Sequence, residues 1–389
     1  MQSTESIIHV MQTLGKKREP LTRIYRQLWN ENLYVSAYSR LYANDGALTP
    51  GATPETADGM SLAKIRRIIE QVKTETYHWT PVRQKDIPRP DGRTRTLGIP
   101  TWSDKLVEEV IRIILEAYYE PIFSTHSHGY RPNRGCHTAL QEIVSHWTGT
   151  VWFIEGDIKG CFDNINHDIL MAALGKRIKD NRLLRFIEYR LKSGIISNWQ
   201  YHRTYSGTPQ GGVLSPLLAN IYLHELDEFI ESRLMPVWNR GKERMRNPEY
   251  RAIEHQKAKA KQNGDVERYQ ELTQEMLRTP SRDMCDPNFR RLKYVRYADD
   301  FLIGFVGTKA EAQVIKRQLG EFLKDTLHLQ LSEDKTLITH GRSEHAHFLG
   351  YAVSIYHNDA KRSYDRRVQG MKRSLNGQVR LGVPYGLVD

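Results

Sequence analysis

The sequence has few cysteines and no long apolar run. Cys136, Cys161 and Cys285 are odd in number and widely spaced along 389 residues, which argues against a disulfide framework and fits a reducing compartment. No stretch approaches the roughly 18 apolar residues that cross a bilayer, and the first residues lack the apolar core of a secretory signal. We therefore expect a cytoplasmic protein with no membrane partner.

Acidic residues are also scarce relative to basic ones. The chain has 57 Lys and Arg against 46 Asp and Glu, a formal net charge of +11. Such a surplus favours a polyanionic partner, because Lys and Arg beside phosphates release condensed counterions. A basic enzyme without a nucleic acid partner would have the same charge, so composition alone leaves both interpretations open.

Periodic patterns predict a chain of mixed helices and strands. Apolar and aromatic residues recur at helical spacing over 21–42, over 61–77 with Ser61 as N-cap, and over about 103–119. Residues 82–100 are expected to form two short strands joined at "PDGR", which gives a basic hairpin.

The stretch "YVRYADDFLIGF" places two adjacent acids inside an apolar and aromatic run. The flanking segments 294–298 and 301–306 are rich in β-branched and aromatic residues, which predicts a β-hairpin with Asp299 and Asp300 at its tip. Adjacent acids are also an ordinary turn signal. Like charges near a packed sheet are costly unless a cation joins them, which favours a Mg²⁺ site.

A third acid, Asp157, ends the apolar run "VWFIEGD", where the pattern predicts a strand followed by a tight turn. Two metal ions about 4 Å apart, bridged by such carboxylates, can activate a 3′-hydroxyl and stabilise a departing pyrophosphate. Together with Asp299 and Asp300, Asp157 therefore predicts nucleotidyl transfer. Asp163 lies past the strand and is interpreted as a turn or structural acid.

Several motifs together resemble one family. "YVRYADDFLIGF" resembles the Y-x-D-D motif of reverse transcriptases, and "GDIKGCFDNINHDIL" resembles their first catalytic motif. "GTPQGGVLSPLLANIYLHELDEFI" is similar to the following segment of the reverse transcriptases encoded by group II introns, also called maturases. "SHGYRPNRGCHTAL", "LSEDKT" and "HFLGY" occur in the order of that family, so the likeness runs from about residue 21 to residue 364.

The resemblance implies an RNA-directed DNA polymerase of a bacterial cytoplasm. Its partners would be intron RNA, an RNA template with a DNA primer, and dNTP, and its cofactor Mg²⁺ with Mn²⁺ as substitute. Splicing assistance and retrohoming are implied as well, and whether the chain forms a homodimer is left open. The implied fold class is α+β: right-hand polymerase fingers and palm, with an antiparallel palm sheet, helical fingers and a helical N-terminal extension.

The order of segments in that family implies a division of the chain. We expect an N-terminal extension (1–60), fingers (61–150), palm with the first catalytic motif and the nucleotide-pocket motif (151–232, interleaved with fingers helices near 171–203), a charged helical insertion (233–291), palm with the YADD hairpin and primer grip (292–364), and the start of a truncated thumb (365–389). Residues 233–291 carry 14 Lys and Arg against 9 Asp and Glu, so they have little to bury. Most of the thumb and any C-terminal domains are expected to be absent.

The resemblance assigns the chemistry to a small set of residues. Asp157, Asp299 and Asp300 would bind the metals, with the Ile158 carbonyl as a further ligand. Lys335 in "LSEDKT" matches a lysine that protonates the departing pyrophosphate, and a surface lysine is the alternative.

Nucleotide contacts are implied at four positions. Phe162 matches an aromatic steric gate against the ribose 2′-hydroxyl, and a core phenylalanine is the alternative. Gln210 would line the nucleotide pocket. Arg89 and Arg95 match residues that hold triphosphate oxygens, for which the planar guanidinium is suited.

Nucleic acid contacts are implied elsewhere. Arg131 and Arg134 match phosphate ligands of the template, and Arg83 in the basic hairpin is a weaker candidate. The primer grip would comprise His347, Phe348, Leu349 and Gly350.

Two other interpretations stay open. The chain could be mainly a non-catalytic RNA-binding splicing factor, which needs the basic surface but not the acids. It could also be a reverse transcriptase of another bacterial retroelement or of a CRISPR-associated system.

Overall fold

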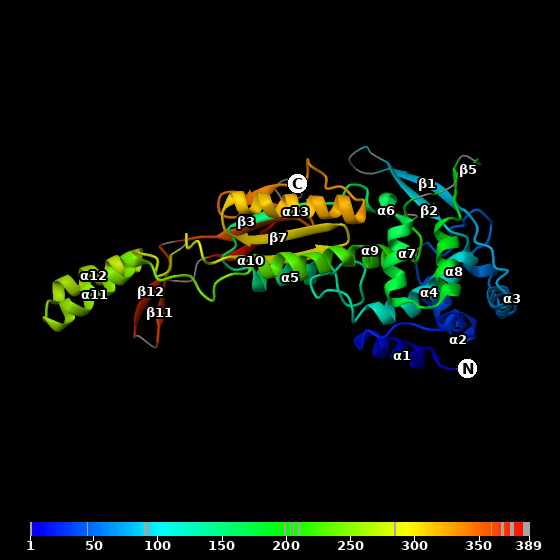
Figure 1. Ribbon diagram of the computed structural model, residues 1–389, viewed down its shortest axis with the longest axis horizontal. Coiled ribbons are helices and arrows are strands. Elements are labelled where there is room, and N and C mark those ends of the chain that lie inside the picture. Colours follow the sequence, from blue (N-terminus) through cyan, green and yellow to red (C-terminus); the bar gives the residue numbers. More distant parts are fainter. Residues whose placement is uncertain are drawn as a thin grey trace. The chain divides into compact units, whose positions relative to one another are not determined.

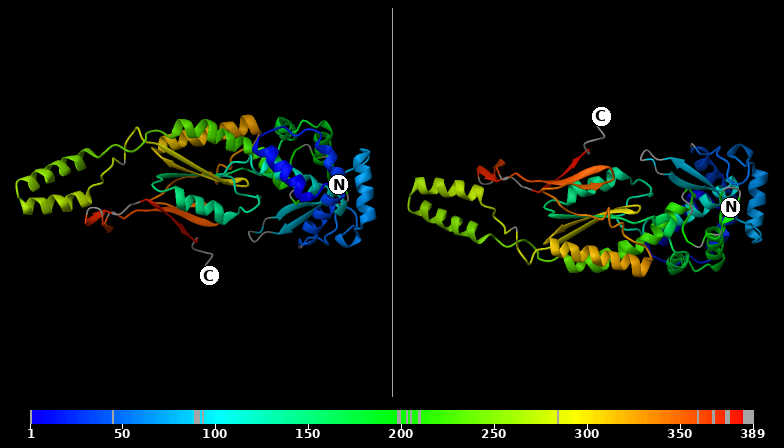
Figure 2. Two further views of the ribbon diagram at one scale, coloured as in Figure 1. Left: turned by 90° about the horizontal axis from the view of Figure 1, so that it is seen from below. Right: turned by 90° about the horizontal axis from the view of Figure 1, so that it is seen from above.

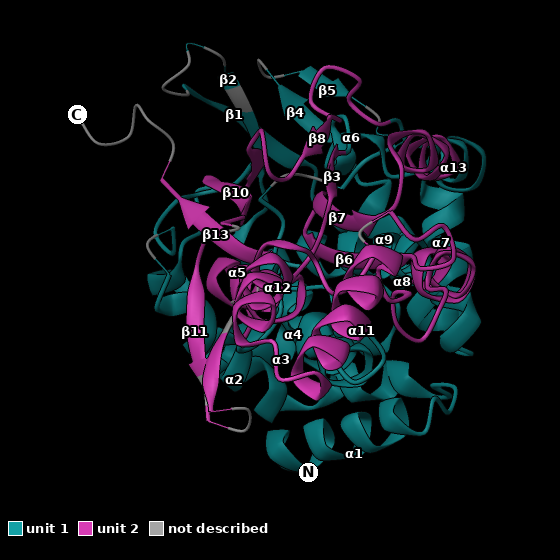
Figure 3. Cartoon of the chain, turned by 90° about the vertical axis from the view of Figure 1, so that its left-hand side faces the viewer, with its two compact units in different colours: residues 1–133, 158–227, 321–330 teal, residues 134–157, 228–320, 331–389 magenta. Residues whose placement is uncertain are grey.

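The structure is a computed structural model of the chain. It describes residues 2–383 except positions 45, 89–91, 93, 198–199, 203, 205, 209–210, 284, 359, 367–368 and 374–376, and except the side chains at positions 95, 365, 372 and 373. Two compact units are present (Figure 3). Unit 1 comprises Met1–Asn133, Ile158–Asp227 and Glu321–Gln330, and unit 2 comprises Arg134–Asp157, Glu228–Gly320 and Leu331–Asp389. Each unit contains helices and antiparallel strands, so the expected α+β fold class is confirmed.

Unit 1 is mainly helical (Figure 1). Its helices are α1 (Thr4–Lys16), η1 (Ile24–Trp29), α2 (Glu31–Tyr42), η2 (Ala57–Gly59), α3 (Leu62–Lys73), α4 (Trp102–Tyr119), α6 (Cys161–Asn164), α7 (His167–Arg177), α8 (Asn181–Leu191) and the start of α9 (Ser215–Phe229). Helix α4 is buried along most of its length and packs against α1 and α2. A sheet of order β2-β1-β4-β5 completes the unit, with β1 (Val82–Pro88), β2 (Thr94–Ile99), β4 (Ile195–Ser197) and β5 (Gln200–His202).

Local capping corrects some of the predicted helix boundaries. The single helix expected over 21–42 is wrong, because extended Asn30 separates η1 from α2 and accepts a hydrogen bond from the Asn32 N–H as an N-cap. Ser61 does cap α3, by accepting from the Lys64 N–H at 3.2 Å. The predicted strands over 82–100 are confirmed as β1 and β2.

Unit 2 contains the antiparallel sheet expected of a palm. Its order is β6-β7-β3-β8, with β6 (Arg291–Tyr297), β7 (Asp300–Val306), β3 (Trp152–Asp157) and β8 (Ile338–His340). A second sheet has the order β13-β10-β9, with β13 (Gln378–Gly382), β10 (Tyr351–Tyr356) and β9 (Ala346–Phe348). Strands β11 (Arg362–Asp365) and β12 (Gly370–Arg373) form a separate pair.

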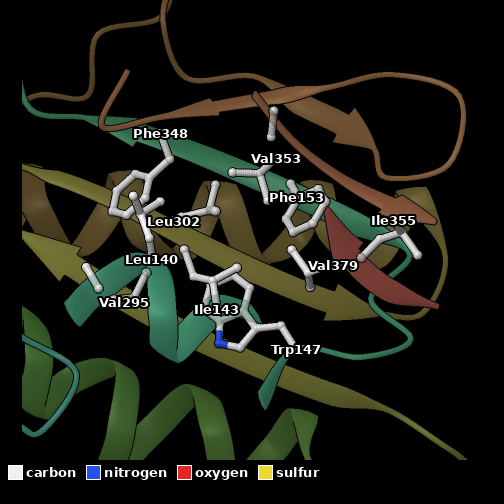
Figure 4. Packing of buried hydrophobic residues seen from close by; sticks show 12 residues of the cluster. Leu140, Ile143, Trp147, Phe153, Val295, Leu302, Phe348, Val353, Ile355 and Val379 are labelled. Atoms are coloured by element: carbon white, nitrogen blue, oxygen red, sulfur yellow. The ribbon is translucent and has the colours of Figure 1, made fainter. Parts of the chain in front are cut away.

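Helices α5 (Cys136–His146) and α13 (Lys309–Leu327, whose last turns belong to unit 1) accompany these sheets. One apolar core joins α5 to both sheets of unit 2 (Figure 4). Trp147 stacks on Phe153 of β3, with ring centroids 6.4 Å apart. The labelled residues of this core are Leu140, Ile143, Trp147, Phe153, Val295, Leu302, Phe348, Val353, Ile355 and Val379. The strand that ends in Asp157 is therefore held by packing from residues far along the chain.

The charged segment 233–291 begins within η3 (Ile230–Leu234), which continues into α10 (Met235–Trp238). Its middle forms two longer helices, α11 (Pro248–Gln262) and α12 (Val266–Arg278). Figure 2 shows α11 and α12 side by side as a helical hairpin. The hairpin has its own small core of Ile253, Ala260 and Leu272. Within the part of the chain that is described, no helix is long and apolar enough to cross a membrane.

Gly156 provides a test of the packing around β3. It lies opposite Phe301 on β7, and a Cβ at this position would be 2.1 Å from the Phe301 ring. We expect Gly156→Ala to lower the free energy of unfolding by about 1–3 kcal/mol, because the ring is fully buried and cannot move aside. Denaturant unfolding measures this change.

Gly320→Ala is the matched control. Its Cβ would meet only Leu331 Cδ1 at 3.7 Å, an ordinary contact. This change within helix α13 should leave the stability unchanged or raise it by roughly 0.5–1 kcal/mol. Equal unfolding of Gly156→Ala and wild type would contradict the packing of Phe301 over Gly156.

Candidate active site

The three predicted metal ligands lie together at one end of the sheet in unit 2. Antiparallel pairing puts Asp157, the last residue of β3, opposite Asp300. Asp300 also pairs with Tyr297 across the hairpin, so the turn consists of Ala298 and Asp299 alone. The sequence suggested that both acids occupy the tip, whereas only Asp299 is in the turn and Asp300 is the first residue of β7.

The hairpin turn is strained and is held from inside the unit. Ala298 has φ +55°, in the left-handed region that residues with a Cβ rarely adopt. The side chain of Arg296 is fully buried and donates a hydrogen bond from Nη1 to the Ala298 carbonyl at 2.8 Å. Arg296 therefore fixes the turn that presents Asp299. Sequence reasoning missed this residue, although an arginine inside the run "YVRYA" is the signal that could have found it.

The acids affect each other's protonation. Burial raises the pKa of Asp299, and the negative charge of Asp157 raises it further. Burial raises the pKa of Asp300 to about 6, with additional contributions from the charges of Asp299 and Asp157. The positive charge of Lys335 acts in the opposite direction on the pKa of both residues. The cluster is thus a place where negative charge is unfavourable without a cation.

Lys335 lies directly against the acids. Its ammonium donates to both carboxylate oxygens of Asp157, at 3.0 and 3.1 Å. The position is fixed through the backbone, because the Ser332 N–H donates to the Asp157 carbonyl at 2.8 Å and the Thr336 N–H donates to the Ser332 carbonyl. Lys316 of α13 in turn donates to the Thr336 carbonyl. The structure thus brings Lys335 to the acids, and its role as a proton donor stays a prediction.

The donor chemistry of this cluster fits Mg²⁺. Among the described residues, no group of three or more Asp, Glu, His or Cys side chains is arranged so that these side chains alone could hold a metal ion. Mg²⁺ in enzymes that act on phosphates takes only one or two carboxylates and completes its shell with phosphate oxygens and water. Asp157, Asp299 and Asp300 supply such carboxylates, and Ile158, the predicted carbonyl ligand, follows Asp157 directly and is buried.

Phe162, the predicted steric gate, lies in the short helix α6 of unit 1. Its side chain is half-buried, with an edge-to-face contact to the ring of Tyr130 at 6.1 Å. Its carbonyl accepts a hydrogen bond from the Thr208 N–H at 2.8 Å. The ring is thus partly accessible, and its role as a steric gate stays a prediction.

Residues 207–214, here called the nucleotide loop, contain the predicted pocket residue Gln210. Gln210 itself is outside the described residues. The loop begins at Gly207, whose N–H donates to the Ile165 carbonyl at 2.8 Å. The Gly207 carbonyl contacts His167 Nε2 at 2.8 Å. The entry of the loop is therefore fixed to the segment that follows Phe162.

A buried glutamate fixes the other end of the nucleotide loop. Glu108 of α4 accepts hydrogen bonds from the N–H groups of Val213 and Leu214, at 2.7 and 3.2 Å. These donors precede α9, where a carboxylate also interacts favourably with the helix dipole. Arg190 of α8 is buried beside Glu108 and pairs with it. Sequence reasoning missed Glu108, and its signal is an acid within the apolar helix "KLVEEVIRII".

Arg131 is a structural residue and not a phosphate ligand. It is 7% exposed, and its guanidinium donates to both carboxylate oxygens of Glu120 at 3.0 and 2.8 Å. It also donates to the carbonyls of Ser124 and Ser127, each at 2.6 Å. The prediction of a template contact is wrong for this residue, because its donors are already bonded to protein acceptors.

The other basic candidates are described to different extents. Arg83 on β1 is half-buried, and its Nη2 donates to the Pro50 carbonyl at 2.7 Å. Arg134 is half-buried. Arg89 lies outside the described residues, as does the side chain of Arg95. Phosphate contacts by these four arginines stay predictions.

The predicted primer grip is a tight hairpin in unit 2. Phe348 pairs with Tyr351, so the turn consists of Leu349 and Gly350, which have φ +52° and +81°. Two positive φ values are typical of the turns that join antiparallel strands with two residues. The ring of Phe348 is buried in the core, so only the backbone of this residue is left for a primer contact, whereas His347 is exposed.

The raised pKa of Asp300 predicts how stability depends on pH. Because its pKa in the folded protein is above the ordinary value, the fold favours the protonated form, and stability is lost as pH rises from about 4 to about 6. Asp300→Asn removes this loss. In buffer with EDTA at pH 7, we expect the variant to be more stable than wild type by about 1–2 kcal/mol, after allowance for solvent screening.

Urea unfolding at pH 4 and pH 7 measures the difference. Asp334→Asn, which removes an exposed acid from the neighbouring turn, is the control and should show no such gain. Added Mg²⁺ should stabilise wild type more than Asp300→Asn at pH 7. An equal stability difference at both pH values would show that the pKa of Asp300 is not raised.

Known proteins resemble this chain over most of its length. A family model described as reverse transcriptase (RNA-dependent DNA polymerase) matches residues 87–259. The group II intron-encoded protein LtrA of Lactococcus lactis subsp. cremoris is 46% identical over 374 residues, which cover 94% of this chain and 62% of LtrA. The chain thus spans about three fifths of that relative.

Two further relatives differ in length. An uncharacterized 91 kDa protein in the cob intron of Schizosaccharomyces pombe is 39% identical over 360 residues, which cover 90% of this chain and 44% of that protein. Protein YkfC of Escherichia coli is 30% identical over 336 residues, which cover 82% of this chain and 80% of YkfC.

Proposed function

Because this chain belongs to the family of reverse transcriptases encoded by group II introns, we propose that it adds dNTPs to a primer 3′-hydroxyl on an RNA template. The observation that supports this activity most directly is the placement of Asp157, Asp299 and Asp300 at one end of the sheet, with Lys335 against them. Like charges of this kind are unfavourable in isolation and become favourable around divalent cations.

The proposed mechanism assigns one task to each residue of the cluster. Asp157, Asp299 and Asp300 would hold two Mg²⁺ ions, or Mn²⁺ in their place, with the Ile158 carbonyl as a further ligand. When bound, these ions lower the pKa of the 3′-hydroxyl and stabilise charge on the phosphates. Lys335 would donate a proton from its ammonium to the departing pyrophosphate.

Selection of the nucleotide is proposed for unit 1. The half-buried ring of Phe162 would clash with a ribose 2′-hydroxyl, and Gln210 in the nucleotide loop would contact the dNTP. Arg89 and Arg95 would bind the triphosphate, since guanidinium groups form bidentate bonds with phosphate. The two bonded ends of the loop support this role, because a pocket that discriminates must be held in place.

A role in intron splicing is proposed alongside polymerisation. The net charge of +11 suits binding to intron RNA, and the similarity to LtrA supports a group II intron as the source of that RNA. We propose splicing assistance and retrohoming in a bacterial cytoplasm.

We also propose a division of the chain into domains. It comprises an N-terminal extension (1–60), fingers (61–150), palm (151–232 and 292–364), a charged insertion (233–291) and the start of a thumb (365–389).

Primer extension distinguishes polymerase from a mainly RNA-binding splicing factor. Asp299→Asn should lower the extension rate on an RNA template with Mg²⁺ by roughly 100-fold or more, because a metal ligand supplies several kcal/mol of transition-state stabilisation. Binding of the same RNA should change by less than about threefold, since the charge altered is small beside the basic surface.

Asp334→Asn is the control for a general effect of charge and should extend primers as wild type does. An Asp299→Asn variant that extends normally would contradict the assignment of the site. A wild-type chain that binds RNA but adds no nucleotide with Mg²⁺ would favour the splicing factor.

The steric gate has a separate test. Phe162→Ala should raise the efficiency of rNTP incorporation relative to dNTP by about 10–100-fold, because the ring no longer excludes the 2′-hydroxyl. Phe162→Tyr retains the ring and should discriminate as wild type does. Single-nucleotide addition with each triphosphate measures the ratio, and an unchanged ratio in Phe162→Ala would assign discrimination to another residue.

A further inference from the structure

Glu155 is a buried acid to which the proposed chemistry assigns no role. It lies on β3 two residues before Asp157 and is 7% exposed. A carboxylate in such a place is costly unless both oxygens accept hydrogen bonds. Oε1 accepts from the Thr339 hydroxyl on β8, and Oε2 accepts from the His347 N–H on β9 at 2.9 Å. Both oxygens are thus bonded, each to a different strand.

The bond from His347 joins the two larger sheets of unit 2, whereas the bond from Thr339 stays within the sheet of Glu155 and holds its carboxylate in place. Thr339 belongs to the sheet β6-β7-β3-β8, which carries the acids, and His347 belongs to the sheet β13-β10-β9, which carries the predicted primer grip. The sheets also share the apolar core, in which Phe153 of β3 and Phe348 of β9 both lie (Figure 4). Apolar packing is not directional, so it permits small shifts that a hydrogen bond to one particular N–H does not.

The path from Glu155 to the reacting groups is short on both strands. Asp157 is two residues along β3 from Glu155, and the turn of Leu349 and Gly350 begins two residues after His347. That turn has only two residues, so a shift of the His347 backbone moves the whole hairpin tip. The Glu155 carboxylate therefore holds the primer-grip turn, Leu349 and Gly350, at a fixed position relative to Asp157.

We propose that Glu155 is a positioning residue that aligns the primer 3′ end with the catalytic acids Asp157, Asp299 and Asp300. The residue does not contact substrate, and it acts through the backbone of His347. This proposal rests on the proposed polymerase function and on the primer-grip role of residues 347–350. It predicts that loss of the two hydrogen bonds misplaces the primer end without altering selection of the nucleotide.

The chemistry of the two bonds provides a matched pair of variants. The Thr339 hydroxyl can accept as well as donate. Glu155→Gln can therefore accept from the His347 N–H through its carbonyl and donate to Thr339 through its amide, which keeps both bonds. Glu155→Met has a similar length and keeps neither bond. The comparison separates hydrogen bonding from the volume of the side chain.

Steady-state primer extension with the full chain tests the proposal. In Glu155→Met, kcat/KM for primer-template should fall by about tenfold or more, because small misplacements of reacting groups are costly, while the KM for dNTP changes less than about twofold. Glu155→Gln should stay within about threefold of wild type. Glu344→Met is the control, because the exposed Glu344 accepts from the His340 N–H at 2.8 Å and has no bond to β9.

A second readout measures the primer end directly. The fluorescence of 2-aminopurine at the primer 3′ terminus reports its stacking, and we expect it to change in Glu155→Met and not in Glu155→Gln. If Glu155→Met does not fold, Thr339→Val removes one of the two partners with little change of shape and should give a smaller shift of the same kind. Wild-type extension with an unaltered primer end in Glu155→Met, or in Thr339→Val if Glu155→Met does not fold, would overturn this proposal, whereas an inactive wild type would overturn the proposed function itself.

Discussion

Repulsion among three carboxylates at one end of a sheet is the constraint on which unit 2 depends. Backbone pairing of β3 with β7 holds Asp157 opposite Asp300, so the acids cannot separate without breaking the sheet. Burial makes the negative charges still less favourable, as the raised pKa of Asp300 shows. A site of this kind persists only if the surrounding structure supplies the stability that the acids remove.

That stability comes from residues outside the motifs. Arg296 bonds the carbonyl of the strained Ala298, and Ser332 bonds the carbonyl of Asp157. The shared core packs Phe153 of the catalytic strand against α5 and the second sheet. Each acid is therefore held by its backbone, which leaves the carboxylates available for Lys335 and for cations.

The sequence predicted the strands that carry the acids, and it failed where the hydrogen-bond partners of one side chain decide its role. The strands around the acids follow from an apolar run and from segments rich in β-branched and aromatic residues, so Asp157 and the hairpin of Asp299 were found. Arg131 looked like a phosphate ligand because an arginine in a polar stretch does not reveal that Glu120 and two carbonyls will surround it. The break at Asn30 was missed because periodicity ignores a single residue whose side chain caps the next helix.

Four acids with restricted access to solvent, the buried Glu108 and Glu155 and the half-buried Asp299 and Asp300, fall into two kinds. Glu108 and Glu155 have hydrogen-bond donors on both carboxylate oxygens, so their charges are compensated by the fold itself. Asp299 and Asp300 instead face other acids, and their pKa values are raised in spite of Lys335. Saturated bonding therefore indicates an acid that positions the backbone, whereas unrelieved repulsion indicates an acid that binds a cation supplied from outside.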